Sequence, residues 1–425
     1  MVHVHFVENS SLVPYEEWKA YVQKNRFVLE QTDLTERFQN SLGWLDVDRW
    51  ANPSMQSQLQ TIAQKVREKA EVFAVVGLGG SNQGARAVIE ALSFRQTSSP
   101  NIIYPALYLS AAEYQRILRT TEGKNLVVDI IAKNFKTLEP GVGFRMLRNE
   151  LCRRYGREGM REHIITTPTL GLDALDELSQ KEGYVEVPFP EDIGGRYSIF
   201  SPVGLLPIAV AGFQIEELVR GARDAQKDFA LGGSLSKAFR AYALRRNFLY
   251  EKGFDVEATV VFEPSLNALG MWWRQLFGES EGKDGKGIFP TVLTNTESLH
   301  SLGQYMQSGK RHVSETFLHV NTPLADLPIG DGCGLKDDFD YLDGKTLNDL
   351  NEAAYQATVK AHSEGGVPCH VIEMDVMDEY HLGMYMYAMM RACYDSALVL
   401  GVNPFDQPGV EAYKKEMFQK LKERN

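Results

Sequence analysis

The sequence predicts an α/β protein built from two doubly wound parallel sheets. Short apolar runs alternate with helical segments along most of the chain, which is the pattern of parallel strands joined by crossover helices. The chain has 425 residues, more than one ordinary core holds, so two domains are expected. The predicted order is an N-terminal helical segment, a first α/β domain, connecting helices, and a second α/β domain with a C-terminal helix, over residues 1–50, 51–205, 206–250 and 251–425.

The first α/β domain is predicted from the apolar run Val72 to Val76. A glycine-rich turn and a helix to about Leu92 follow this run, which completes a strand–turn–helix unit. Residues from about 10 to 70 show helical spacing of apolar positions. Further strand candidates follow at 101–109, 126–131, 162–166 and 184–187.

The second α/β domain is predicted to begin after helices over roughly 203–250. Ala258 to Phe262 is a predicted strand that leads into a helix through Leu276. Further strands are expected around Thr291, Phe317 and 368–373, and a long helix is expected over 379–400. In folds of this kind, ligands bind at the carboxyl ends of the strands.

Composition excludes several classes of partner. The net charge of −11 and the pI near 5.4 argue against a nucleic acid or an anionic membrane surface. No apolar stretch is long enough to span a membrane, and the N-terminus lacks the pattern of a signal peptide. The four cysteines are widely spaced, so neither a disulfide framework nor a metal site is predicted. A cytoplasmic protein is expected.

The turn Gly77-Leu-Gly-Gly-Ser-Asn-Gln-Gly84 lies between a strand and a helix. Backbone N–H groups and the helix dipole at such a position can hold an anion. The turn lacks the third glycine of a dinucleotide-binding fingerprint, because Asn82 takes its place, and it lacks the Lys-Ser/Thr ending of a P-loop. It is either a tight turn without a ligand or a cradle for phosphate or another small anion.

Arg196 follows two glycines that permit close approach of backbone to a ligand. A guanidinium group there could stabilise a developing oxyanion, although an arginine after a turn is more often simply solvated.

Glu279 lies where a helix with an apolar stripe runs into a segment dense in Glu, Gly and Lys, over 278–287. The ordinary interpretation is a solvated loop after a helix. The neighbouring Phe277 and tryptophans favour a carboxylate at the edge of a packed wall, where it could move a proton α to a carbonyl.

Three segments together resemble the glucose-6-phosphate isomerase family in its bacterial form: Gly-Gly-Arg-Tyr-Ser at 194–198, Gly-Glu-Ser-Glu-Gly-Lys-Asp-Gly-Lys-Gly at 278–287, and Phe-Asp-Gln-Pro-Gly-Val-Glu-Ala-Tyr-Lys at 405–414. The resemblance covers nearly the whole chain. It implies two sugar-isomerase (SIS-type) domains, a small anionic sugar as substrate, a homodimer, and neither a metal nor an organic cofactor.

The resemblance also implies roles for individual residues. Glu279 would be the base that moves a proton between C2 and C1 through a cis-enediol intermediate, and Arg196 would stabilise the enediolate. His300, supplied by the partner subunit, and Lys414 would assist ring opening. The residues implied to bind substrate are Gly80, Ser81, Gly195, Gln275 and Gln407, together with the anion loop at Lys133, Asn134, Lys136 and Thr137.

That anion loop departs from the family pattern. The family reads like Ser-Lys-x-x-Thr-Thr, whereas this chain has Ala132-Lys-Asn-Phe-Lys-Thr137, and the Gly-Asn-Asn run usual near 106–110 is missing. The first interpretation is that Lys136 compensates for lost hydroxyls and glucose 6-phosphate remains the substrate. The second is that the loop fits another 6-substituted hexose, such as sulfoquinovose, which would be isomerised to 6-deoxy-6-sulfofructose. A third hypothesis is an inactive sugar-phosphate-binding paralogue.

Overall fold

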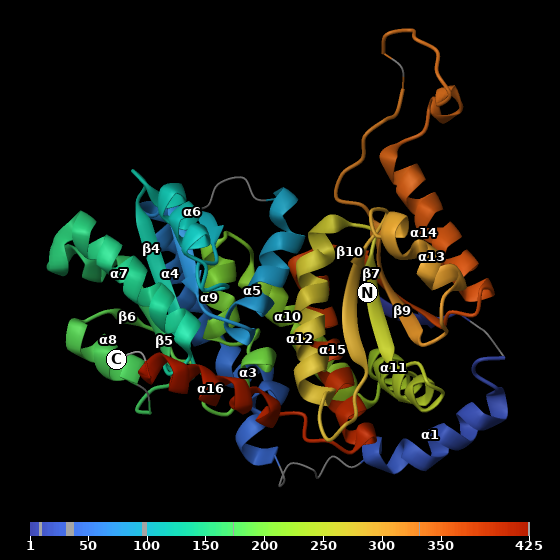
Figure 1. Ribbon diagram of the computed structural model, residues 1–425, viewed down its shortest axis with the longest axis horizontal. Coiled ribbons are helices and arrows are strands. Elements are labelled where there is room, and N and C mark those ends of the chain that lie inside the picture. Colours follow the sequence, from blue (N-terminus) through green and yellow to red (C-terminus); the bar gives the residue numbers. More distant parts are fainter. Residues whose placement is uncertain (8–10, 31–37, 96–99, 173, 331, 424–425) are drawn as a thin grey trace.

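The computed structural model describes residues 1–7, 11–30, 38–95, 100–172, 174–330 and 332–423. The described chain forms two five-stranded sheets, and helices cover both faces of each (Figure 1). The predicted α/β fold with two doubly wound parallel sheets is confirmed.

The first sheet is wholly parallel and has the strand order β3-β2-β4-β5-β6. In β2, alternate residues enter two different cores: Val72, Ala74 and Val76 face one, whereas Phe73 and Val75 face the other. This explains why the run is apolar at every position. The strands are β2 Val72–Val76, β3 Asn101–Ile103, β4 Leu126–Ala132, β5 Ile164–Pro168 and β6 Val185–Glu186, and the helices beside them are α4 Pro53–Lys69, α5 Gly80–Ala91, α6 Ala111–Thr121, α7 Leu138–Gly159 and α8 Ala174–Glu182.

The second sheet has the order β1-β10-β9-β7-β8, and only β1 runs antiparallel to its neighbour. Its strands are β1 Val2–Phe6, β7 Val256–Val261, β8 Phe289–Thr294, β9 Val313–Thr322 and β10 Cys369–Val376. The helices around it are α1 Tyr15–Glu30, α11 Ser234–Glu251, α12 Asn267–Glu281, α13 Leu299–Ser308, α14 Leu347–Glu364 and α15 Glu379–Leu400.

One large core joins the two sheets. It contains residues of both, among them Phe73 and Ile131 of the first sheet and Val261 and Ile372 of the second. The helices α9 (Pro202–Val210) and α10 (Ile215–Leu231) contribute to it, and α10 packs along α15. The helices α5 and α12 also pack against each other. The start of α5 and the end of α12 are therefore held in one rigid unit.

Three local predictions differ from the structure. The N-terminal segment, expected to be helical, begins with the strand β1, which pairs with β10. The strand expected over 101–109 ends at Ile103. The helix expected to end near Leu276 continues to Glu281, so Glu279 lies on a helix and not in a loop.

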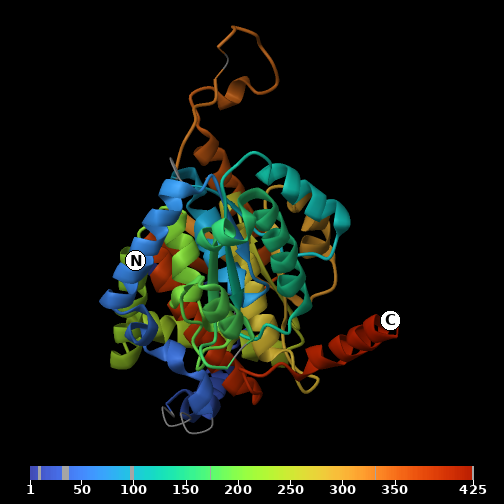
Figure 2. The ribbon, with the colours of Figure 1, turned by 90° about the vertical axis from the view of Figure 1, so that its left-hand side faces the viewer.

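Two segments extend from the body of the molecule. The connection from β9 to α14, over 323–330 and 332–346, projects far outward, and α16 (Glu411–Lys422) points away in a different direction (Figure 2). Within the described ranges, no helix combines the length and apolar character needed to span a membrane.

Candidate active site

The glycine turn after β2 lies at the seam between the two sheets. Gly79 has a φ of +59°, and a Cβ there would lie 2.7 Å from the side-chain nitrogen of Gln275 on α12. A Cβ on Gly80 would lie 2.0 Å from the carbonyl carbon of Gly195. Gly80 is therefore required by close packing and Gly79 by its positive φ, in addition to any ligand that the turn holds.

Arg196 is not solvated but buried, with a relative exposure of 2%. It lies in the 3-10 turn Gly195–Tyr197 and its guanidinium group reaches α12. Nη1 donates to Oε2 of Glu279 at 3.1 Å, and Nε donates to Oγ of Ser280 at 2.9 Å. Nη2 donates to the Pro404 carbonyl at 2.5 Å and to the Asp406 carbonyl at 3.4 Å. One arginine thus joins all three segments that carry the family resemblance.

Glu279 lies in the last turn of α12, with about a third of its side chain exposed, 34%. Its Oε1 accepts a hydrogen bond of 3.0 Å from Gln275, one turn earlier, and its Oε2 accepts the bond from Arg196. The carboxylate lines a cavity of about 730 Å³, together with Gly79, Gln83 and Lys286. A carboxylate held in a fixed orientation at a cavity wall, next to a cation, can remove a proton while the cation stabilises the resulting anion.

A second arginine, Arg246 of α11, contacts the buried side of the same turn of α12. Its Nη1 donates to Oε1 of Glu281 at 2.6 Å, and its Nε forms a short contact with Glu257. Tyr242 donates to Glu257 at 2.7 Å. These groups are almost completely buried. They fix the end of α12 from behind, and no local sequence pattern marks them as buried.

Lys283 connects α12 to the C-terminal segment. Its ammonium donates to the carbonyls of Ser280, at 3.0 Å, and Asn403, and lies 3.4 Å from Asp406. Burial lowers the pKa of Lys283. Segment 403–406 is thereby held beside Arg196.

Other predicted site residues do not reach Glu279 within this chain. His300 is exposed at the start of α13, which follows the carboxyl end of β8, whereas Glu279 lies at the far end of α12 from the carboxyl end of β7. Lys414 lies on α16, where it donates to Glu411 at 3.0 Å. Gln407 is exposed just before α16.

The anion loop begins at the carboxyl end of β4, next to the glycine turn that follows β2, because the two strands are neighbours. Ala132 is buried in the core, so its side chain faces away from solvent. Lys133 donates to the carbonyls of Glu191 and Ile193 at 2.9 and 2.8 Å, which ties the loop to the segment before Arg196. The side chain of Asn134 accepts from the Lys136 amide at 3.1 Å.

Two residues complete the anion loop. Thr137 precedes α7 and its hydroxyl donates weakly to the Asn134 carbonyl, at 3.5 Å. Lys136 is exposed. Gly80 and Ser81 form the first turn of the adjacent helix α5. The two predicted halves of the anion cradle therefore lie next to each other, at the carboxyl ends of the neighbouring strands β2 and β4.

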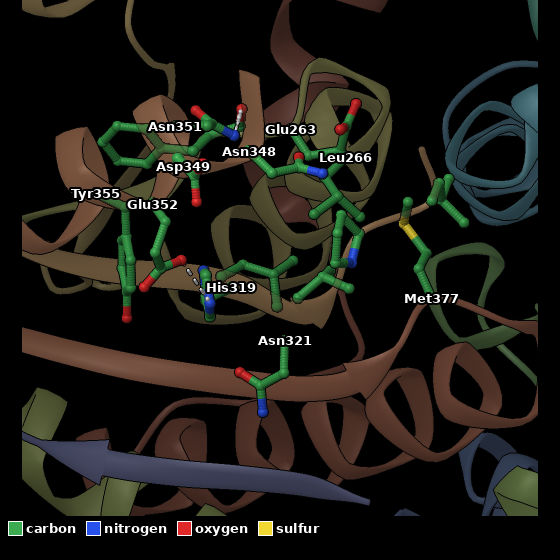
Figure 3. A pocket seen from close by; sticks show the side chains of 15 residues that line it. Glu263, Leu266, His319, Asn321, Asn348, Asp349, Asn351, Glu352, Tyr355 and Met377 are labelled. Carbon is green, nitrogen blue, oxygen red and sulfur yellow. Dashed lines mark hydrogen bonds and ion pairs between the residues drawn. The ribbon is translucent and has the colours of Figure 1, made fainter. Parts of the chain in front are cut away.

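A second cavity, of about 390 Å³, lies at the carboxyl ends of β7 and β9 (Figure 3). His319 stacks on Tyr355 with a centroid distance of 4.2 Å and lies 3.4 Å from Glu352. Burial lowers the pKa of His319. The carboxylates that line this cavity disfavour an anionic sugar, and none of the predicted site residues lies there. No cluster that could hold a metal ion occurs among the residues that the structure describes.

Comparisons with known proteins show which family this chain resembles. The family model described as phosphoglucose isomerase matches residues 58–320. A glucose-6-phosphate isomerase of Symbiobacterium thermophilum is 42% identical over 392 residues, which cover 89% of this chain and 86% of that protein. A glucose-6-phosphate isomerase of Shouchella clausii is 40% identical over 435 residues, which cover 99% and 96%.

Solved structures share the fold. A hypothetical protein of Thermus thermophilus has a TM-score of 0.85 and 25% identity, over 98% of this chain and 100% of that one. A glucose-6-phosphate isomerase of Chlamydia trachomatis has a TM-score of 0.80 and 18% identity, over 99% and 88%.

By its fold and its relatives, the chain is an aldose–ketose isomerase. Within that class, the chain belongs to the phosphoglucose isomerase family.

Proposed function

We propose that this chain interconverts glucose 6-phosphate and fructose 6-phosphate through a cis-enediol. The observation that carries the proposal is the carboxylate of Glu279, which Gln275 and Arg196 orient at the wall of the cavity. Glu279 takes the proton from C2 of the open-chain aldose, and the pair of electrons left behind makes the enediolate. The same carboxyl group then returns a proton to C1 while the hydroxyl proton moves from O2 to O1, which yields the ketose.

Arg196 supplies the positive charge that the enediolate needs. The guanidinium is already buried and hydrogen bonded before any substrate charge develops, so little reorganisation accompanies the reaction. For the anionic group at C6, we propose the backbone amide of Gly80, the hydroxyl of Ser81 and the loop 133–137 with Lys136. Both elements lie at the carboxyl ends of neighbouring strands of the first sheet.

Kinetics with several sugars test the substrate. We expect a far higher kcat/KM for glucose 6-phosphate than for 6-deoxy-6-sulfoglucose, for the 6-carboxyl analogue or for glucose. A preference for the sulfonate would transfer the proposal to sulfoquinovose. The absence of turnover for every sugar, with glucose 6-phosphate still bound, would support an inactive paralogue.

The Glu279→Gln variant tests the base. It keeps the size of the side chain, and we expect turnover and solvent-proton exchange at C2 to fall on the order of 10³-fold while substrate still binds. Near-native turnover of this variant would refute the assignment.

We further propose a homodimer in which His300 of one copy completes the site of the other, while Lys414 acts from α16. The exposed position of His300 and the connection before α14 support this. That connection exposes Leu327, Leu335, Phe339 and Tyr341, each by more than 60%, and exposed apolar groups in one segment favour a protein partner. The cytoplasm suits four free cysteines.

Mixing two inactive variants tests the shared site. A heterodimer of His300→Ala and Glu279→Gln chains contains one site with both intact groups if His300 acts across the interface. Random exchange makes half of the dimers mixed, so about a quarter of the native activity should return. No return of activity after confirmed subunit exchange would place His300 in its own chain's site.

A further inference from the structure

We infer that Gln83 contacts the substrate and selects for one sugar hydroxyl. This inference rests on the proposed function and deepens it. Gln83 lies in the first turn of α5, two residues after Ser81, and lines the same cavity as Glu279. Neither the glycine-rich pattern nor the family resemblance predicted Gln83 as a substrate-binding residue.

The side-chain amide of Gln83 forms no hydrogen bond with the residues that the structure describes. Its oxygen is buried and accepts no hydrogen bond. Its neighbour Asn82 behaves differently, because its amide nitrogen donates to the Gly77 carbonyl at 2.6 Å and so holds the turn together. A buried polar group without a partner is unfavourable, and a hydroxyl in the cavity would offset that penalty.

A matching amide lies on the other side of the site. Gln275 of α12 uses its nitrogen to bind Glu279, while its oxygen is buried and accepts no hydrogen bond. Both amides line the cavity, one from each of two helices that pack together. Two neutral amides next to a single carboxylate fit a ligand with several hydroxyl groups.

The chemistry of an amide points to a hydroxyl and not to the anionic end of the sugar. Gln83 carries no charge, whereas the expected anion cradle has a backbone amide and a hydroxyl at a helix start and the ammonium of Lys136. An amide can both donate to and accept from a hydroxyl. A site built to bind a hydroxyl rejects an analogue that lacks it, because the protein group is then left unpaired.

The test compares the full substrate with its monodeoxy analogues. In Gln83→Leu we expect kcat/KM for glucose 6-phosphate to fall about 10- to 100-fold. For the one analogue that lacks the contacted hydroxyl, among 3-deoxy- and 4-deoxy-glucose 6-phosphate, we expect little further loss. Met271→Leu, which changes another cavity-lining side chain at nearly constant volume, is the control and should leave the preference among sugars unchanged.

A binding measurement separates this inference from the proposed function. Calorimetric titration of wild type and Gln83→Leu with glucitol 6-phosphate needs no turnover. A dissociation constant at least 10-fold weaker in Gln83→Leu supports the contact. Equal affinity, or an equal loss of kcat/KM for every sugar, overturns it, while a wild type that does not isomerise glucose 6-phosphate counts against the proposed function alone.

Discussion

A buried arginine contacts the last turn of α12 on each of its two sides, and the two arginines have different partners. On the cavity side, Arg196 meets one carboxylate that is a third exposed, and otherwise meets a hydroxyl group and backbone carbonyls. On the other side, Arg246 meets two carboxylates, Glu257 and Glu281, that are completely buried.

Under the proposed function, the same side-chain type serves chemistry on one side of α12 and rigidity on the other. The partner of Arg196 keeps access to a ligand, so the pair can respond when charge develops nearby. The partners of Arg246 have no such access, and their only contribution is to fix the helix that carries Glu279. Changes on the two sides should therefore affect different measurements.

Arg246→Met should produce the largest loss of stability. It leaves two buried carboxylates without their cation, which typically costs about 3–5 kcal/mol of the free energy of unfolding. Urea unfolding measures the loss. The triple variant Arg246→Met, Glu257→Gln, Glu281→Gln removes all three charges and should recover most of it. A triple variant no more stable than the single one would show that shape, and not unpaired charge, is responsible.

Arg196→Lys should show the opposite pattern. The lysine keeps the charge but cannot reproduce the fork that reaches Glu279, Ser280 and Pro404 at once, so kcat should fall about 10²-fold. The free energy of unfolding should fall less than in Arg246→Met. Arg116→Lys, at a surface pair with Glu113, is the control and should change neither quantity. A stability loss that exceeds the catalytic loss would contradict the division of tasks.

Asp129 extends the comparison to a buried carboxylate without an arginine. It lies in β4, its Oδ1 accepts from Thr167 at 3.0 Å, and burial raises its pKa to about 7. A raised pKa in the folded state means that its contribution to stability is complete below the unfolded pKa, near 4, and is lost as the pH rises through about 7.

Asp129→Asn should remove this pH dependence. We expect a gain in the free energy of unfolding on the order of 2 kcal/mol at pH 8 and little change at pH 4. Urea unfolding at several pH values measures both. A loss of stability at pH 8 would show that the carboxylate is ionised and has a compensating partner.

Lys283→Met should have the smallest effect. The ammonium bridges α12 and segment 403–406, so its removal should cost about 1 kcal/mol of local stability and lower kcat less than tenfold. Hydrogen exchange of amides at 403–410 should become faster, while exchange in the first sheet should not. Unchanged exchange at 403–410 would mean that Arg196 alone holds this segment.

Much of the fold could be predicted because its strands are buried on both faces. The runs at 72–76 and 126–132 are apolar at nearly every position for that reason. The strand β1 was missed because its partner, β10, lies more than 360 residues further along the chain. No local pattern reports that pairing.

The site could be predicted in part. Glu279, Arg196 and Gln275 were identified, and the structure brings them together. Arg246 and Glu281 were missed because a charged residue on a helix is ordinarily exposed, and their burial depends on Glu257, which belongs to another element. His300 and Lys414 were identified by resemblance alone, and their distance from Glu279 follows from their positions on α13 and α16.

The contact between Gly80 and Gly195 has a consequence for how the cavity can open. Two backbones that leave no room for a methyl group between them cannot act as a hinge, and the core that continues from one sheet into the other prevents sliding. The floor of the site is therefore fixed. Any gate for the sugar must lie at the rim, where the side chain of Lys136 is exposed and α16 points away from the body of the molecule.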